Sequence, residues 1–194
     1  TIPDSVTSIG DYTFFSCVSL TTITIPDSVT SIGDVAFAGC DDLTSITIPD
    51  SVTSIGDRAF LLCESLTAIN ADSDNKYYAS EDGVLFNKDK SVLVLYPMGK
   101  TAKKYVMPDG VTTIGNNAFY RCNNLTSITI PDGVTTIGNK AFASCDNITS
   151  ITISDSVTSI GDDVFNYCGN LTFINVDSDN KYYASEDGVL FNKD

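Results

Sequence analysis

The six cysteines are the residues of this chain best suited to chemistry. They stand at positions 17, 40, 63, 122, 145 and 168, and neighbours within each group of three are 23 residues apart. Thiols can act as nucleophiles, bind metals or form disulfides. The chain has no histidine and no Cys-x-x-Cys pair, so a Cys/His or Ser/His catalytic pair and a zinc site are both disfavoured. We expect no catalytic residue, no metal and no cofactor.

Disulfides fit the spacing poorly. If each 23-residue stretch forms one coil of a stack, like side chains lie over like at about 4.8 Å, the spacing of strands. Parallel side chains then keep the Cβ atoms near that distance, whereas a disulfide needs about 3.8 Å. We therefore expect free thiols that form a buried structural ladder, because a free cysteine packs as a small apolar side chain. Its members are Cys17, Cys40, Cys63, Cys122, Cys145 and Cys168.

The elements that position these cysteines repeat along the whole chain. Aligned on an Ile-Pro-Asp phrase, 23-residue repeats start near residues 2, 25, 48, 107, 130 and 153. A longer coil, with an insert at 70–105, separates the third repeat from the fourth, and its second copy begins at 175 and is cut off at 194. Such self-similarity indicates a stacked-repeat architecture. We expect one continuous solenoid over 1–194, and a fragment of a longer array because neither end resembles a polar cap.

One repeat predicts one coil. Ile46 and Ile48 alternate with outward Ser45 and Thr47 in a short strand that Pro49 ends. Val52 and Ile55 then point inward from a second extended step. Asp57 is expected to cap a single helical turn that directs Ala59, Phe60 and Cys63 to the core. The fold class is therefore an α/β repeat solenoid, a strand-rich right-handed stack of coils with short helical turns.

The long coil contains two apolar runs, VLFN and VLVLY, on either side of residues 87–90. This pattern predicts a β-hairpin, which a strand at Tyr77-Tyr78 can join. One interpretation is that Tyr78, Leu85, Phe86, Leu93 and Leu95 refill the core that the missing Phe and Cys vacate. The other is that the hairpin projects as a binding loop with exposed tyrosines. The DSDN phrase at 72–75 does not fit an EF-hand, since Tyr77 stands where glycine is needed; solvated turn residues or a weak surface calcium site remain.

Composition disfavours two classes of partner. The formal net charge is −14, and the few lysines and arginines are scattered. Nucleic acid and anionic membrane surfaces both require clustered positive charge. No apolar run is long enough to insert into a bilayer. We expect no nucleic-acid partner and no direct membrane insertion.

The phrase LxxIxIPxxVTSIGxxAFxxC, with its period of 23, resembles the BspA-like leucine-rich repeats. The resemblance covers the whole chain, and the Tyr78–Lys88 phrase is similar to longer coils found in such arrays. It implies a leucine-rich-repeat solenoid of an extracellular or cell-surface protein, and a role in adhesion to proteins or glycans. It supplies no site residues, because the shared motif is almost wholly core.

Candidate ligand-binding residues come from the outward strand positions, the tyrosines of the long coil and the variable edge of the turn. A uniform stripe of small hydroxyls favours a repetitive ligand such as a glycan, or no ligand on that face. The candidates are Thr22, Thr24, Ser45, Thr47, Ser127, Thr129, Ser150, Thr152, Tyr77, Tyr182, Tyr120 and Arg121.

Three functions follow from this surface. The first is a non-enzymatic cell-surface or secreted binding module for a host or neighbouring-cell protein or glycan. The second is a structural spacer that self-associates end to end through exposed strand edges. The third is an ice-binding threonine face. Asn124, Asn147 and Asn170 each begin an Asn-x-Thr sequon, which matters only in a host that glycosylates.

Overall fold

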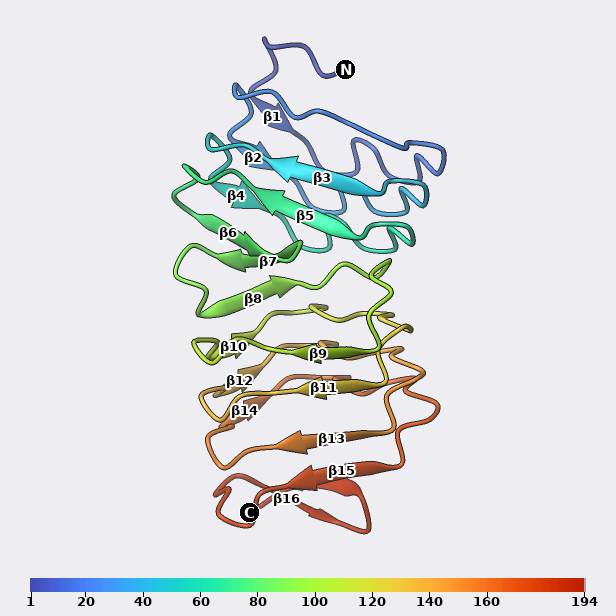
Figure 1. The fold of residues 1–194 in the computed structure, drawn as a ribbon, viewed down its shortest axis with the longest axis vertical. Coiled ribbons are helices and arrows are strands. Elements are labelled where there is room, and N and C mark those ends of the chain that lie inside the picture. Colours follow the sequence, from blue (N-terminus) through green and yellow to red (C-terminus); the bar gives the residue numbers. More distant parts are fainter. Residues whose placement is uncertain (194) are drawn as a thin grey trace. The chain divides into compact units, whose positions relative to one another are not determined.

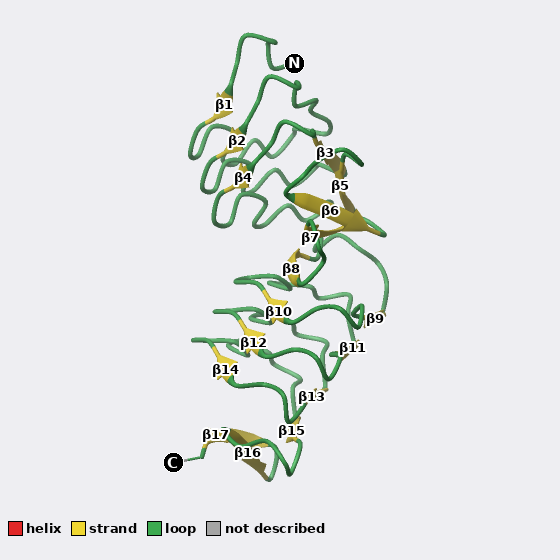
Figure 2. Ribbon diagram, turned by 90° about the vertical axis from the view of Figure 1, so that its left-hand side faces the viewer, coloured by secondary structure: helices red, strands yellow, loops and turns green. Residues whose placement is uncertain are grey.

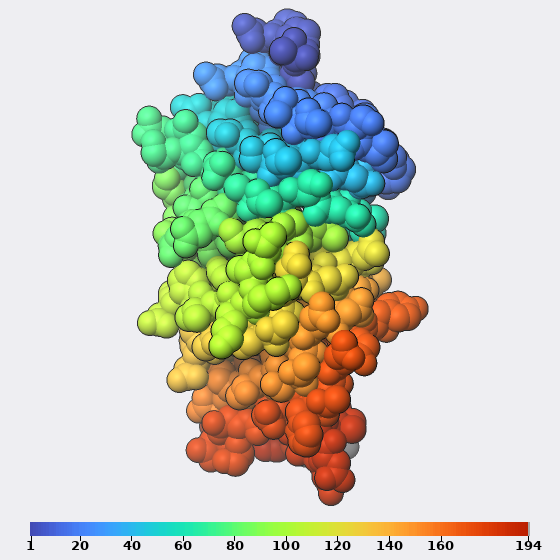
Figure 3. Space-filling view, turned by 45° about the vertical axis from the view of Figure 1, so that its right-hand side comes forward, coloured from blue at the N-terminus to red at the C-terminus, as the bar shows by residue number. Residues whose placement is uncertain are grey.

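The computed structural model describes residues 1–193 and divides the chain into two compact blocks. The N-terminal block comprises Thr1–Asp89 and Leu95–Lys100, and the C-terminal block comprises Lys90–Val94 and Thr101–Asp194. Within each block successive coils follow one another as separate bands of colour (Figure 3). Each block is therefore a solenoid built from the same coil.

The N-terminal block contains three kinds of strand pairing. Two-residue strands β1 (Ser8–Ile9), β2 (Ser31–Ile32) and β4 (Ser54–Ile55) form a parallel sheet in which each residue faces its equivalent 23 positions on. Longer strands β3 (Ser45–Ile48) and β5 (Ala68–Ala71) pair in parallel in the same register (Figure 1). Strands β6 (Tyr78–Glu81) and β7 (Val84–Asn87) form an antiparallel hairpin.

The C-terminal block repeats this plan. Its short parallel strands are β10 (Thr113–Ile114), β12 (Thr136–Ile137) and β14 (Ser159–Ile160). Val92 and Leu93, the first two residues of β8 (Val92–Leu95), pair in parallel with β10. The longer strands are β9 (Lys104–Val106), β11 (Ser127–Thr129), β13 (Ser150–Ile153) and β15 (Phe173–Val176). The hairpin is β16 (Tyr183–Glu186) with β17 (Val189–Asn192).

Inward side chains of successive coils stack on one another, as the repeat predicts. In β3 the exposed Ser45 and Thr47 alternate with the buried Ile46 and Ile48, and the strand ends before Pro49. Phe37 lies between two other phenylalanine rings, 5.1 Å from Phe14 and 5.5 Å from Phe60 between centroids, with interplanar angles of 11° and 7°. Burial of such ladders supplies the main stabilisation, because no coil encloses a core alone.

The predicted helical turn is wrong. Residues 1–193 contain no helix, and the segment after each Gly-Asp or Gly-Asn is a pair of tight turns (Figure 2). Arg58 and Leu62 have φ values of 56° and 60°, which an α-helix does not allow. The carbonyls of Asp57, Ala59 and Leu61 accept hydrogen bonds from the preceding coil instead of from their own. Ala59, Phe60 and Cys63 are nevertheless buried, so the pattern predicted the core but not the backbone.

The cysteine ladder is only partly buried. All six cysteines are free thiols; Cys40, Cys63, Cys122 and Cys145 are buried, Cys168 is half-buried and Cys17 is exposed. The expectation of six buried thiols is therefore wrong for Cys17, and it holds only in part for Cys168. Cys63 donates its S–H to the carbonyl of Phe37 at 3.1 Å, and Cys145 donates to Phe119 at 2.9 Å. The thiol thus satisfies a carbonyl of the preceding coil as well as filling space.

The hairpin of the N-terminal block turns at a different place from the one predicted. Its two-residue turn is Asp82-Gly83, with φ values of 49° and 75°, and not residues 87–90. Asp-Gly with positive φ at both positions is the preferred two-residue hairpin turn. Asp89 and Lys90 belong to different blocks. Leu85, Phe86 and Leu93 are fully buried, which confirms that part of the long coil refills the core, whereas Tyr78 and Leu95 are half-buried.

Three hydrogen bonds attach this hairpin to the coil before it. The N–H of Ile69 donates to the Gly83 carbonyl at 2.9 Å, and the N–H of Ala71 donates to the Ser80 hydroxyl at 3.0 Å. The hairpin therefore covers an edge of β5. The N–H of Ile55 donates to the Tyr78 hydroxyl at 2.9 Å. The second copy repeats all three contacts through Gly188, Ser185 and Tyr183. The hairpin thus satisfies strand groups that a further parallel coil would otherwise pair.

Candidate ligand-binding face

The outward side chains of the longer strands form columns along each block. In the N-terminal block Ser45 pairs with Ala68 and Thr47 pairs with Asn70 in adjacent strands. Ser45, Thr47 and Asn70 are exposed, because the alternation of a strand sends every second side chain away from the core. Thr22 and Thr24, the equivalent residues of the preceding repeat, are also exposed, although that stretch has no assigned strand.

The C-terminal block carries a longer version of this face. Its equivalent residues form two columns across β9, β11, β13 and β15, in which β9 pairs with β11, β13 pairs with β15, and β11 contacts β13 (Figure 1). One column contains Lys104, Ser127, Ser150 and Phe173, and the other contains Val106, Thr129, Thr152 and Asn175. All eight residues are exposed. The structure therefore places the predicted residues Ser127, Thr129, Ser150 and Thr152 side by side on one surface.

Sequence reasoning missed two members of this face. Lys104 pairs with Ser127, and Val106, which is 71% exposed, pairs with Thr129. The signal was present, since AKKYVM matches the LTSITI phrase of a regular repeat and so puts Lys104 and Val106 in outward positions. Together with Phe173, which is 54% exposed, they give the hydroxyl columns a cationic and apolar border. Such a face combines hydrogen-bonding groups with the larger side chains that usually anchor a ligand.

The two tyrosine candidates of the long coils occupy equivalent places. Tyr77 and Tyr182 are 51% and 50% exposed, and the backbone N–H of each donates to a buried asparagine side chain at 2.8 Å. Tyr120 and Arg121 lie elsewhere, on the outer turn, and both are half-buried. The structure does not bring these four residues together with the strand columns into one pocket.

Asn75 and Asn180, the last residues of the two DSDN phrases, are buried side chains and not the solvated turn residues that the sequence predicts. Asn75 is fully buried; its side-chain amide donates to the carbonyls of Pro49 (2.6 Å) and Val52 (3.0 Å), and its side-chain oxygen accepts from the N–H groups of Tyr77 and Tyr78. This buried amide has no part in cation binding. Among residues 1–193 no group of three metal-ligating side chains is assembled.

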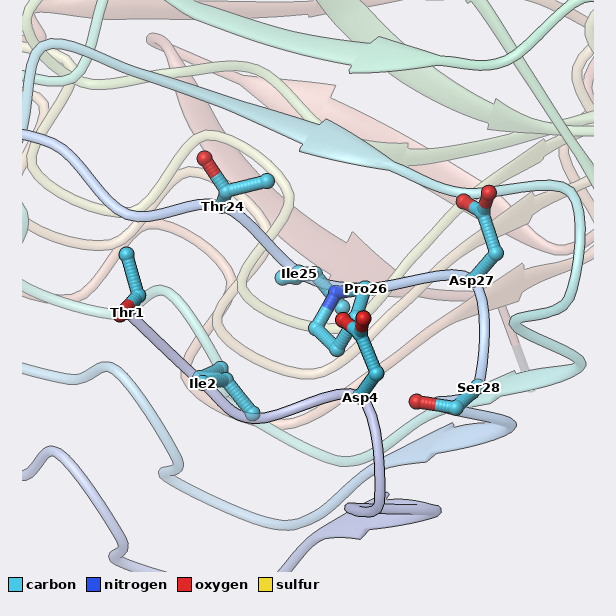
Figure 4. Close-up of a pocket in the computed structure, with 8 residues that line it drawn as sticks. All are labelled: Thr1, Ile2, Asp4, Thr24, Ile25, Pro26, Asp27 and Ser28. Carbon is cyan, nitrogen blue, oxygen red and sulfur yellow. The ribbon is translucent and has the colours of Figure 1, made fainter.

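A pocket lies between the first two Ile-Pro-Asp segments of the N-terminal block. Figure 4 shows that its walls come from equivalent residues of consecutive repeats, with Thr24 of the predicted face among them. Asp4 and Asp27 both line it, and the Ser28 hydroxyl donates to the Val6 carbonyl at 2.6 Å. The pocket has two carboxylates and no nucleophile–base pair, so it offers a polar recess and no catalytic arrangement.

Stacked 23-residue coils with parallel strands and inward aliphatic ladders define a leucine-rich-repeat solenoid. The model of the BspA type leucine-rich repeat region matches six copies over residues 1–83 and 98–187, and the chain belongs to this family. No curated protein matches the chain.

Solved structures of bacterial leucine-rich-repeat proteins have the same fold. A leucine-rich cell surface protein from Faecalibacterium prausnitzii is 34% identical with a TM-score of 0.73, over 89% of this chain and 52% of that one. A leucine-rich-repeat protein from Eubacterium ventriosum is 33% identical with a TM-score of 0.70, over 88% of this chain and 57% of that one. The pneumococcal vaccine antigen PcpA, at 24% identity and a TM-score of 0.68, shares the fold. The chain spans little more than half of each of the first two proteins. Residues 1–193 contain no helix able to cross a membrane.

Proposed function

We propose that this protein is a non-enzymatic binding module of the cell surface or of a secreted protein, whose strand face adheres to a protein or glycan of a host or neighbouring cell. The observation that carries the proposal is the paired columns of exposed side chains on β9, β11, β13 and β15. The similarity to a leucine-rich cell surface protein and to a vaccine antigen supports the location. A solvated face of paired columns, with larger side chains at its border, suits an extended ligand.

Glycan and matrix-protein arrays test this proposal. The blocking variant is Ser127→Arg with Ser150→Arg, which places two large side chains on adjacent strands of the face. The control is Gly110→Arg with Gly133→Arg: both glycines are exposed turn residues, a Cβ at Gly110 meets nothing within 4 Å, and a Cβ at Gly133 comes no closer than 3.4 Å to its neighbours. We expect bound array spots for the wild type and the control, with signals at least about tenfold lower for the blocking variant. Equal signals for the two variants would remove the strand face as the binding surface.

A further inference from the structure

A basic segment begins the strand face of the C-terminal block. The basic residues of the chain are few, but four of the eleven lie within residues 90–108, which contain no acidic residue. Two of them, Lys103 and Lys104, belong to the C-terminal block, and Lys104 starts the outward column that continues with Ser127 and Ser150. A positive segment of a chain whose formal net charge is −14 therefore coincides with the proposed binding surface.

The exposure of these lysines comes from their place in the coil. Lys103 and Lys104 are exposed, and so are Thr126 and Ser127, the equivalent residues of the next repeat. Ser127 lies on β11, which has β9 on one side and β13 on the other (Figure 1). A position that is exposed with a coil on either side is open to a ligand wherever the stack begins or ends.

The two ammonium groups have no partner in the protein. Within residues 1–193, neither Lys103 nor Lys104 forms an ion pair or a side-chain hydrogen bond, whereas Lys100 donates to the carbonyl of Asp82. The outward positions of β9, β11 and β13 hold no carboxylate. Because salt screens exposed charges over about 8 Å at physiological ionic strength, carboxylates farther away weaken the positive field at these lysines only slightly.

The hydroxyls beside the lysines are also available to a ligand. The Thr126 hydroxyl donates to the Lys103 carbonyl at 3.0 Å and so is used within the stack. Four outward hydroxyls make no hydrogen bond within residues 1–193; they belong to Ser127, Thr129, Ser150 and Thr152. Each hydroxyl can donate and accept, and strands stacked in this way are about 4.8 Å apart. Such a ladder fits a ligand that presents the same groups in every unit.

We propose that the lysine end of the strand face (Lys103, Lys104 and Val106 with the four hydroxyls) binds an anionic polysaccharide, a proposal that rests on the function proposed above. The two ammonium groups pair with a carboxylate or a sulfate, since lysine is a flexible point charge that suits either anion. The hydroxyls bond the hydroxyls of neighbouring sugar units, and Val106, which is 71% exposed, contacts an apolar ring face. An acidic peptide supplies the anions without the repeated hydroxyls, so the polysaccharide is the better match.

Two matched pairs of fluorescein-labelled polymers test the proposal. Polygalacturonate is compared with its fully methyl-esterified form, and dextran sulfate with dextran, so that each pair keeps the chain and removes the anion. Anisotropy is followed as the intact protein is added. We expect saturable binding of at least one anionic polymer, which weakens with added salt, and at least about tenfold weaker binding of its neutral partner. No saturable binding of either anionic polymer, or equal binding of the neutral partner, overturns the proposal.

A pair of lysine variants locates the binding. The test variant is Lys103→Thr with Lys104→Ser, which copies the Thr-Ser of the next repeat (126–127) and so protects the fold. The matched control is Lys76→Thr with Lys181→Thr, which removes the same charge from two exposed lysines outside the face. We expect at least about tenfold weaker binding for the test variant and less than about a twofold change for the control. Equal losses overturn the assignment to this end of the face.

A hydroxyl variant tests whether the ligand is a sugar chain. Ser127→Ala with Thr129→Val removes two hydroxyls and leaves both lysines in place. We expect at least about fivefold weaker binding of the anionic polysaccharide, because two hydrogen bonds to it are lost. Polyglutamate and oligothymidylate represent acidic protein and nucleic acid as ligands. Binding of either one as tightly as the polysaccharide, or an unchanged affinity in the hydroxyl variant, overturns the assignment to a polysaccharide.

The glycan and matrix-protein arrays separate this proposal from the function on which it rests. Array signals that the blocking variant of the strand face loses, together with no binding of either anionic polymer, overturn the anionic ligand and leave the binding module in place. Blank arrays together with no binding of either polymer overturn both.

Discussion

At the scale of the residue, a single buried amide joins each long coil to the repeat before it. In regular coils a serine hydroxyl satisfies the valine carbonyl of the Pro-Asp-Ser-Val turn, as Ser51 does for Val29 at 2.7 Å. Asn75 takes over this task for Val52 and adds bonds to Pro49, Tyr77 and Tyr78. Four partners use the full capacity of the side chain, which explains how an amide can be buried among apolar ladders.

We expect Asn75→Ala to lower the free energy of unfolding by about 2–4 kcal/mol, because it leaves two carbonyls and two N–H groups of the backbone without partners. Ser51→Ala removes one comparable bond and should cost only about 1 kcal/mol. Urea denaturation of both variants measures the difference. Equal losses would show that Asn75 acts merely as another turn residue.

The buried thiols predict a dependence of stability on alkaline pH. Burial raises the pKa of Cys40 from 9.0 to about 11, and burial likewise raises the pKa of Cys63 and of Cys145 to about 12. Between these pKa values and 9.0, the folded chain keeps the thiol protons while the unfolded chain releases them. The contribution of the neutral thiols to the free energy of unfolding is therefore fully present below pH 9 and is lost as the pH rises toward 11–12.

Denaturation midpoints measured between pH 8 and pH 11 should fall, and the fall should be shallower for Cys63→Ala with Cys145→Ala than for the wild type. The wild type and the double variant are both compared with Cys17→Ala, a control in which the substituted cysteine is exposed. Tyrosine and lysine titrations are common to all of these proteins and cancel in the comparison. Parallel pH profiles for all three would contradict the thiol effect.

At the scale of the element, the outer turns carry the backbone strain of the coil. Each turn has two residues with positive φ, and Val35 is one of them at 58°, although its branched Cβ makes that conformation costly. The equivalent residue of the fourth regular repeat is Asn117, at 55°. Asparagine adopts this region far more readily than valine.

This pair allows a reciprocal test. Val35→Asn should raise the free energy of unfolding by about 1 kcal/mol, and Asn117→Val should lower it by a similar amount, because the strain is added or removed at one equivalent position. Thermal or urea denaturation of the two single variants shows whether each change raises or lowers the free energy of unfolding. A loss of stability in both would mean that local packing outweighs the backbone term.

The strands were predictable from sequence and the turns were not. Alternation in Ser45–Ile48 and the stop at Pro49 are local signals, so sequence suffices. The spacing of Ala59, Phe60 and Cys63 fits a helical turn as well as a pair of tight turns. The choice depends on hydrogen bonds to the preceding coil, which no local pattern contains. The strand face followed from the same alternation, but Lys104 and Val106 were not among the predicted residues, although AKKYVM matches the regular LTSITI phrase and puts both in outward positions.

At the scale of the whole molecule, acidity works against folding. The formal net charge is −14, and equivalent carboxylates such as Asp4, Asp27 and Asp50 recur every 23 residues along one block. Repulsion among like charges destabilises the compact state and is screened by salt. The repeat itself produces this cost, since it aligns the same charged residue in every coil.

Raising sodium chloride from about 10 mM to about 500 mM should therefore stabilise the chain by roughly 1 kcal/mol, or about 2–4 °C in Tm. Removing the aligned charges as Asp4→Asn, Asp27→Asn and Asp50→Asn should reduce the salt response, whereas a neutral substitution such as Ser45→Ala should not. Calorimetry at several salt concentrations provides the data. A Tm that does not change with salt would show that the carboxylates are too well solvated to repel.

The fixed offsets of the inter-coil bonds have a genetic consequence. Thr30, Thr53 and Thr67 each donate to a carbonyl 23 positions earlier, and Cys63 donates to one 26 positions earlier. A coil therefore needs only the coil beside it, and an in-frame duplication or deletion of one repeat restores every contact at the junction. The near-identical segments at 70–89 and 175–194 offer homologous stretches for recombination that changes the length by 105 residues. We expect natural alleles to differ in whole repeats and seldom in parts of one.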